Sequence, residues 1–149
     1  MMTVRDSAAD INVISFNLHG LRQGQFLLHV LWNRVAPPGI IMLQEHWLTS
    51  DNLFKLHISA NYTVFGGSAM DKATSNAVLV GRPFGGVAIM LRNDLARDAS
   101  CLAIYERFII VKLCDTLFVN TYFPCSTHIT VNYDMLCVTF DELSHELAK

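Results

Sequence analysis

No stretch of this 149-residue sequence stays apolar for the roughly 18 residues that a helix needs to span a bilayer. The first ten residues also lack the apolar segment of a signal peptide, and they contain Arg5, Asp6 and Asp10. We therefore expect an intracellular protein, nuclear or cytoplasmic, that is neither secreted nor inserted in a membrane.

Charged residues are scarce, at 16% of the sequence, and the net charge is −2. The sequence has no basic stripe that would by itself indicate nucleic-acid binding. Its cysteines form no Cys-x-x-C pair, which favours reduced thiols over a zinc site. They are Cys101, Cys114, Cys125 and Cys137.

Hydrophobic residues, by contrast, make up 52% of the chain, and the mean hydropathy is +0.32. This composition excludes a disordered chain and supplies enough apolar material for a core. Two explanations of the high hydrophobic content remain open. The core is rich in buried strands, or an apolar face awaits a partner.

The first half of the sequence predicts alternating strands and helices. Residues 11–18 are rich in β-formers and predict a buried strand, and residues 25–34 have apolar side chains at helical spacing. The helix is ended by Pro37-Pro38-Gly39, and residues 40–44 form a short apolar run typical of a central strand. This order predicts a layered α/β architecture.

The second half predicts mainly strands, with no repeat and no linker. We expect a short helix near residues 53–57, a strand at 62–65, a loop over most of 66–83 and a strand at 85–92. A hairpin of 107–113 with 117–123 follows, and then a last helix with an apolar stripe from Tyr133 to Leu147. The chain therefore reads as one domain or part of one.

Three polar residues stand at the ends of apolar strands: Asn17, Glu45 and Tyr122. Strand ends in α/β sheets commonly bind ligands, because the sheet holds them rigidly beside an open crevice. A carboxylate there suits a hard cation, and an amide adds its carbonyl oxygen. Each residue also has an ordinary structural explanation, as a solvated loop residue, a turn former or a packing residue.

Taken together, the three residues lie within a set of motifs. The segments Ser-Phe-Asn-Leu-His-Gly at 15–20, Leu-Gln-Glu-His-Trp-Leu at 43–48, Gly-Val-Ala-Ile-Met-Leu-Arg at 86–92 and Asn-Thr-Tyr-Phe-Pro at 120–124 follow one another along the chain. In this order they resemble the endonuclease/exonuclease/phosphatase superfamily over about residues 11–147. The Gln-Glu-His-Trp-Leu version is most similar to the apurinic-type endonuclease domains of non-LTR retrotransposons.

The resemblance implies a fold and a chemistry. The fold would be a two-sheet α/β sandwich of the deoxyribonuclease kind, and the activity would be DNA nicking by hydrolysis of a phosphodiester with Mg²⁺ or Mn²⁺. Glu45 would be the carboxylate ligand of the metal, and Asn17 would help to arrange metal and phosphate. Tyr122 would hydrogen-bond a phosphate oxygen, and Pro124 would shape the loop that follows.

The sequence also departs from the family pattern. His19 stands where repair-type relatives have an acidic residue, and no Asp-x-Asn or Ser-Asp-His motif follows Pro124. The resemblance thus implies a fold that is incomplete at its C-terminus: residues 1–10 as a tail and residues 11–149 as the N-terminal part of a domain that normally precedes a reverse transcriptase. Alone, this fragment would have little or no activity and would tend to self-associate.

Two other functions are weighed against this one. The chain is alternatively a non-catalytic remnant or partner-binding fragment, or a phosphatase or phospholipase of the same superfamily. Two residues near Glu45 are expected to be structural. His46 points away from Glu45, since neighbours on an extended segment face opposite sides, and Trp47 packs beneath the metal loop.

Overall fold

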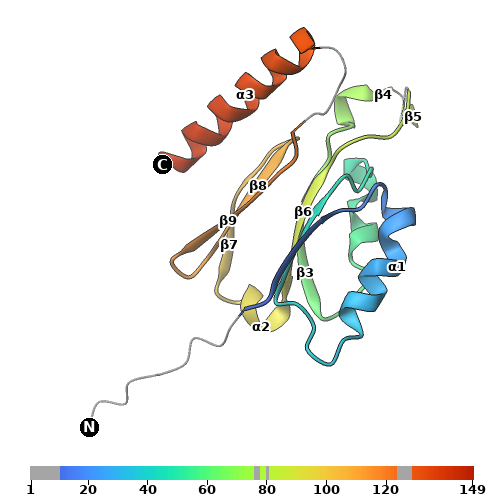
Figure 1. The fold of residues 1–149 in the computed structure, drawn as a ribbon, viewed down its shortest axis with the longest axis vertical. Helices are drawn as coiled ribbons and strands as arrows, with labels where there is room; N and C mark the ends of the chain where they lie inside the picture. The colour runs from blue at the N-terminus through green and yellow to red at the C-terminus, as the bar shows by residue number, and fades with distance from the viewer. Residues whose placement is uncertain (1–10, 76–77, 80, 124–128) are drawn as a thin grey trace.

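A computed structural model of the chain describes residues 11–75, 78–79, 81–123 and 129–149. Two β-sheets pack against each other, and helix α1 (Leu21–Trp32) covers the outer face of the larger sheet (Figure 1). The architecture is therefore the α/β sandwich that the motifs imply.

The larger sheet has the strand order β1-β2-β6-β3. Its strands are β1 (Val13–Asn17), β2 (Ile40–Gln44), β6 (Val87–Arg92) and β3 (Tyr62–Gly67). Strands β1 and β2 are parallel and are joined through α1, whereas β6 runs antiparallel to both β2 and β3. The carboxyl ends of β1 and β2 therefore meet at one edge of the sheet.

The two central strands, β2 and β6, are buried on both faces. Alternate side chains of β6 serve two cores: Ala88 and Met90 face α1, and Val87 and Ile89 face the second sheet. This pattern explains why these strands read as continuous apolar runs rather than as alternating ones.

The smaller sheet has the order β7-β8-β9 and is antiparallel. Strands β8 (Phe108–Leu113) and β9 (Thr116–Thr121) form the expected hairpin, and Cys114 takes a left-handed φ of 51° in its turn. Strand β7 (Ala99–Ile104) completes the sheet.

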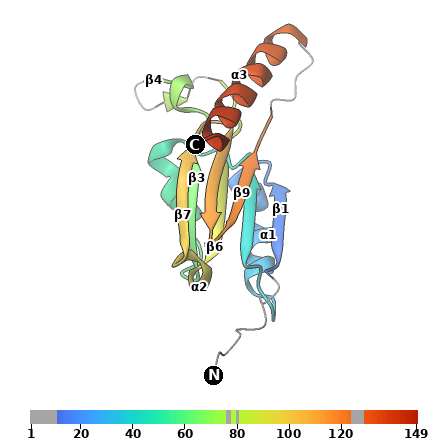
Figure 2. The same ribbon diagram turned by 90° about the vertical axis from the view of Figure 1, so that its left-hand side faces the viewer.

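Helix α3 (Ile129–Leu147) lies beside the upper end of the smaller sheet in both views (Figures 1 and 2). The Tyr105 hydroxyl donates to Glu146 at 2.8 Å, and the rings of Phe123 and Phe140 stack with their centroids 5.0 Å apart. Much of the predicted apolar stripe stays uncovered, since Phe140 and Leu147 are each 48% exposed.

The remaining elements are short. They are the 3₁₀-helices η1 (Ser50–Leu56) and η2 (Asp71–Ala73), the strand pair β4 (Thr74–Ser75) and β5 (Val78–Leu79), and helix α2 (Asn93–Ala96). Within the described residues, no helix is both long and apolar enough to cross a membrane.

The expected strands and helices are confirmed, and the differences concern helix α1, helix α2, which was not predicted, the loop 66–83 and strand β7. Helix α1 begins four residues before the predicted start, directly after Gly20, where backbone bonds to the neighbouring loop fix its first turn. The predicted loop 66–83 contains η2, β4 and β5. Strand β7 was not predicted, because its alternation of small side chains with Leu102 and Ile104 gives a weak signal.

Candidate functional site

Asn17, Glu45 and Tyr122 come together at one edge of the sandwich. Asn17 ends β1, Glu45 directly follows β2, and Tyr122 directly follows β9 on the facing sheet. The Tyr122 hydroxyl donates a hydrogen bond to Oε1 of Glu45. Residues more than 70 positions apart in sequence thus form one cluster, as their strand-end positions predict.

Backbone hydrogen bonds fix the two loops that carry this cluster. The amides of Leu18, Gly20 and Leu21 donate to the carbonyls of residues 44, 45 and 46, at 2.8, 2.8 and 3.0 Å. These bonds continue the parallel β1–β2 ladder beyond the ends of both strands. The position of the Glu45 backbone is therefore set by main-chain groups rather than by side-chain packing.

Three residues in these loops have a left-handed backbone that non-glycine residues rarely adopt: His19, Glu45 and Trp47, with φ of 51°, 55° and 56°. Each such conformation costs on the order of 1–3 kcal/mol and persists where the surroundings enforce it. Strain of this kind gathers at binding and catalytic sites more often than elsewhere, which supports this edge as the functional one.

The Glu45 carboxylate is held in a polar setting although its side chain is only 15% exposed. Burial alone would raise the pKa of the Glu45 carboxyl. Hydrogen bonds from Tyr122 and Asn17, with the attraction of nearby His19, outweigh burial and hold that pKa below its ordinary value. Glu45 is therefore ionised at neutral pH and able to attract a cation.

His19 lies next to this carboxylate, with its Nδ1 3.5 Å from Oε2 of Glu45. Its side chain is 71% exposed, and its ring lies against Trp47 with a centroid separation of 4.8 Å. The Trp47 ring also closes on Gly20, where an added Cβ would lie 2.5 Å from the indole. The prediction that Trp47 packs beneath the loop is thus confirmed.

His46 is fully buried and faces away from the cluster. Its Nδ1 accepts from the Leu48 amide at 3.1 Å, so its Nε2 carries the hydrogen and donates to the Gly67 carbonyl at 3.0 Å. Burial lowers the pKa of His46 and keeps the ring neutral. Its structural role is confirmed, because it ties the Glu45 loop to the end of β3.

A buried amide that the sequence analysis did not single out joins the two sheets. Asn120, 2% exposed, donates from Nδ2 to the carbonyls of Leu43 and Ala88, both at 2.8 Å. Its Oδ1 accepts from the Gln44 amide at 2.5 Å. Since Gln44 precedes Glu45 and Asn120 lies two residues before Tyr122, this bridge sets the register that brings Tyr122 to Glu45.

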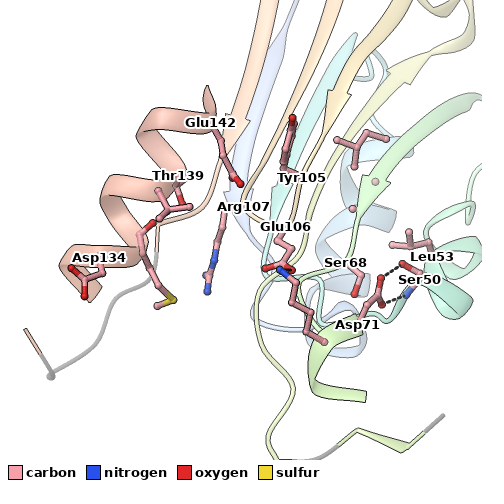
Figure 3. A pocket seen from close by; sticks show the side chains of 16 residues that line it. Ser50, Leu53, Ser68, Asp71, Tyr105, Glu106, Arg107, Asp134, Thr139 and Glu142 are labelled. Atoms are coloured by element: carbon pink, nitrogen blue, oxygen red, sulfur yellow. Dashed lines mark hydrogen bonds and ion pairs between the residues drawn. The ribbon is translucent and has the colours of Figure 1, made fainter. Parts of the chain in front are cut away.

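Arg107 is a second functional candidate that sequence reasoning missed. Its guanidinium lies 5.8 Å from the centroid of the Tyr122 ring, and its carbonyl accepts from the Tyr122 amide at 2.8 Å. Arg107 also lines a groove of about 640 Å³. Figure 3 shows its side chain between α3, which carries Asp134, and the segment that contains Asp71.

The cluster offers a limited set of donors for a metal ion. No group of three or more His, Cys, Asp or Glu side chains suited to a metal occurs among the described residues. The Glu45 carboxylate, the His19 imidazole and the Asn17 amide fit an ion that keeps several water ligands, as Mg²⁺ and Mn²⁺ often do. Pro124, assigned to the loop after Tyr122, lies outside the described residues.

No protein-family model matches the sequence, and no curated protein matches it. Solved structures do share the fold. A 3′ phosphatase from Neisseria, bound to a product DNA hairpin, aligns with a TM-score of 0.59 at 16% identity, over 91% of this chain and 52% of that one. An AP endonuclease from Leishmania major aligns with a TM-score of 0.60 at 16% identity, over 90% and 47%.

A 3′–5′ exonuclease from Neisseria meningitidis aligns with a TM-score of 0.57 at 16% identity, over 91% of this chain and 53% of that one. The chain thus spans about half the length of these structures. At this identity the likeness establishes the fold, and it agrees with the two-sheet sandwich described above.

Proposed function

We propose that the chain is the N-terminal part of a divalent-metal-dependent phosphodiesterase domain of the endonuclease/exonuclease/phosphatase superfamily. In the complete domain, the substrate would be DNA, nicked for a non-LTR retrotransposon whose reverse transcriptase follows. The observation that carries this proposal is the hydrogen bond between Glu45 and Tyr122, which joins the two sheets. The fold is also that of a 3′ phosphatase bound to DNA and of an AP endonuclease.

Each residue of the cluster has a proposed role. Glu45 binds Mg²⁺ or Mn²⁺ through its ionised carboxylate, and the bound ion supplies neutralisation of the charge that develops on phosphoryl oxygens. Asn17 helps to arrange the metal and the phosphate, and with substrate bound the Tyr122 hydroxyl turns its hydrogen from Glu45 to a phosphate oxygen. Pro124 shapes the loop after Tyr122.

Arg107 extends the proposed site towards the groove. Its guanidinium, next to the Tyr122 ring, carries a positive charge that suits a phosphate of the DNA backbone. A chain of net charge −2 needs local cations of this kind to approach DNA.

By itself the 149-residue chain is proposed to have no useful nuclease activity. No Asp-x-Asn or Ser-Asp-His motif follows Pro124, where the resemblance would require both. General-base catalysis alone contributes about 10²- to 10⁴-fold in rate, and each further transition-state donor adds on the order of 10². The proposal for this chain alone is therefore a metal-binding half-site.

The first test is metal binding by the chain itself. Isothermal titration with Mn²⁺ is expected to show binding to the wild type and none to Glu45→Ala, because Glu45 is the one carboxylate that the described part of the chain places in the cluster. Asp94→Ala is the matched control, since that carboxylate is exposed and paired with Arg92. Equal Mn²⁺ binding by wild type and Glu45→Ala would refute the assignment.

The second test concerns the complete protein. The transcript is sequenced beyond the codon of Lys149. An in-frame Asp-x-Asn followed by Ser-Asp-His would give a longer chain whose plasmid-nicking activity should disappear in Glu45→Gln. A stop codon at that point would favour the second candidate, a non-catalytic remnant. A longer chain that releases phosphate from 3′-phosphorylated DNA without nicking would favour a phosphatase, the activity named for one similar structure.

A further inference from the structure

We propose that His19 is a nitrogen ligand of the ion at Glu45, so that the site favours a first-row transition ion such as Co²⁺, Mn²⁺ or Zn²⁺ over Mg²⁺. This inference rests on the proposed function, since it concerns the same ion at the same carboxylate. His19 stands where repair-type relatives have an acidic residue. Position 19 would then supply the ion with an imidazole nitrogen in place of a carboxylate oxygen.

The spacing of the two side chains fits shared coordination better than direct hydrogen bonding. His19 Nδ1 and Glu45 Oε2 are 3.5 Å apart, beyond the 2.7–3.2 Å range that is usual for N–H···O bonds. Two ligands about 2.1 Å from one ion lie roughly 3.0 Å apart at adjacent octahedral positions and roughly 3.4 Å apart at tetrahedral ones. A cation can therefore be bound by both groups with little movement of either.

The orientation of both groups is already fixed. Oε1 of Glu45 accepts from Tyr122, which leaves Oε2 as the oxygen that faces His19. The His19 amide donates to Oδ1 of Asn17 at 2.8 Å, and the His19 ring rests against Trp47. An imidazole held at the surface between an indole and a carboxylate loses little further freedom when it binds an ion.

The chemistry of the two donors decides which ion is favoured. Mg²⁺ binds oxygen ligands almost exclusively and gives up its water reluctantly. Imidazole nitrogen suits the later first-row ions, whose affinity for such sites rises from Mn²⁺ through Co²⁺. Without a metal, a surface ion pair between His19 and Glu45 would add little to the stability of the fold. Metal binding therefore explains better than an ion pair why these two side chains lie together.

The test is Co²⁺ and Mg²⁺ titration of the 149-residue chain, followed by the visible absorption of Co²⁺ and by calorimetry. His19→Phe keeps a ring to pack on Trp47 but removes the nitrogen, and His19→Asp supplies oxygen instead. The matched control is His57→Ala, because His57 is exposed and lies outside the cluster. Unchanged far-ultraviolet circular dichroism establishes that each variant folds.

We expect His19→Phe to weaken Co²⁺ binding at least tenfold while Mg²⁺ binding changes less than threefold. His19→Asp should lower the ratio of Co²⁺ to Mg²⁺ affinity, and His57→Ala should leave it unchanged. Co²⁺ binding that His19→Phe does not weaken would overturn the inference. If that binding is still lost in Glu45→Ala, the proposed function stands; if Glu45→Ala also binds every ion normally, the proposed function fails as well.

Discussion

Replacement of Asn120 by alanine tests the buried bridge between the two sheets. The side chain makes three hydrogen bonds, to Leu43, Ala88 and Gln44, and is 2% exposed. Each buried hydrogen bond contributes about 1 kcal/mol, and the groups left behind lose their partners. We therefore expect Asn120→Ala to lower the free energy of unfolding by about 3 kcal/mol, out of a total of about 5–15 kcal/mol for a typical domain.

Urea denaturation followed by tryptophan fluorescence measures this change, with the slope of the transition used to confirm two-state unfolding. Asn93→Ala is the matched control. Asn93 likewise donates to a backbone carbonyl and accepts from a side chain, Ala60 and Thr63 respectively, but it is exposed and water can replace both bonds. We expect it to cost less than about 1 kcal/mol. Equal costs for the two variants would refute the reasoning that the buried amide joins the sheets.

Further predictions concern the carboxylate, one glycine and the surface. Because its folded pKa is lowered, Glu45 stabilises the fold above its unfolded pKa, and this stability is lost as pH falls through the folded pKa; Glu45→Gln should flatten that dependence in acid denaturation curves. Tyr122→Phe should raise the pKa of Glu45, since burial remains while a donor is lost, and a ¹³C titration showing no rise would contradict this. Gly86→Ala should destabilise by more than about 2 kcal/mol in urea, because φ is 86° and the new Cβ would lie 2.3 Å from the His46 ring. Sedimentation velocity should show concentration-dependent association driven by the exposed apolar side chains, and a monodisperse monomer at all concentrations would count against it.

The sequence predicted the central strands and the cluster for a simple physical reason. Residues 40–43 and 87–91 are apolar at every position because both faces of their strands are buried, and a short run of this kind is typical of a central strand. Asn17, Glu45 and Tyr122 were identifiable because a polar residue directly after an apolar strand stands out. Two parallel strands joined through a helix then place their ends side by side.

The rest depended on three-dimensional packing that local sequence does not encode. In the sequence, Asn120 looks like any polar residue near the end of a strand. Its role as a buried bridge depends on the facing sheet, whose carbonyls at Leu43 and Ala88 accept its hydrogen bonds. Arg107 precedes β8 and gains significance only because Tyr122 pairs with its backbone. Residues 99–104 gave only a weak strand signal, because pairing with β8 determines their conformation more than their own composition does.

The main-chain ladder that joins the loops after β1 and β2 has a consequence for how this site can diversify. Its hydrogen bonds run from the amides of Leu18, Gly20 and Leu21 and involve no side chain of position 19. An exchange at that position therefore leaves the loop geometry in place while it changes the donor atom offered to an ion. At the proposed metal site, a single codon change at position 19 would therefore be enough to alter which ion is preferred, while the backbone keeps its conformation.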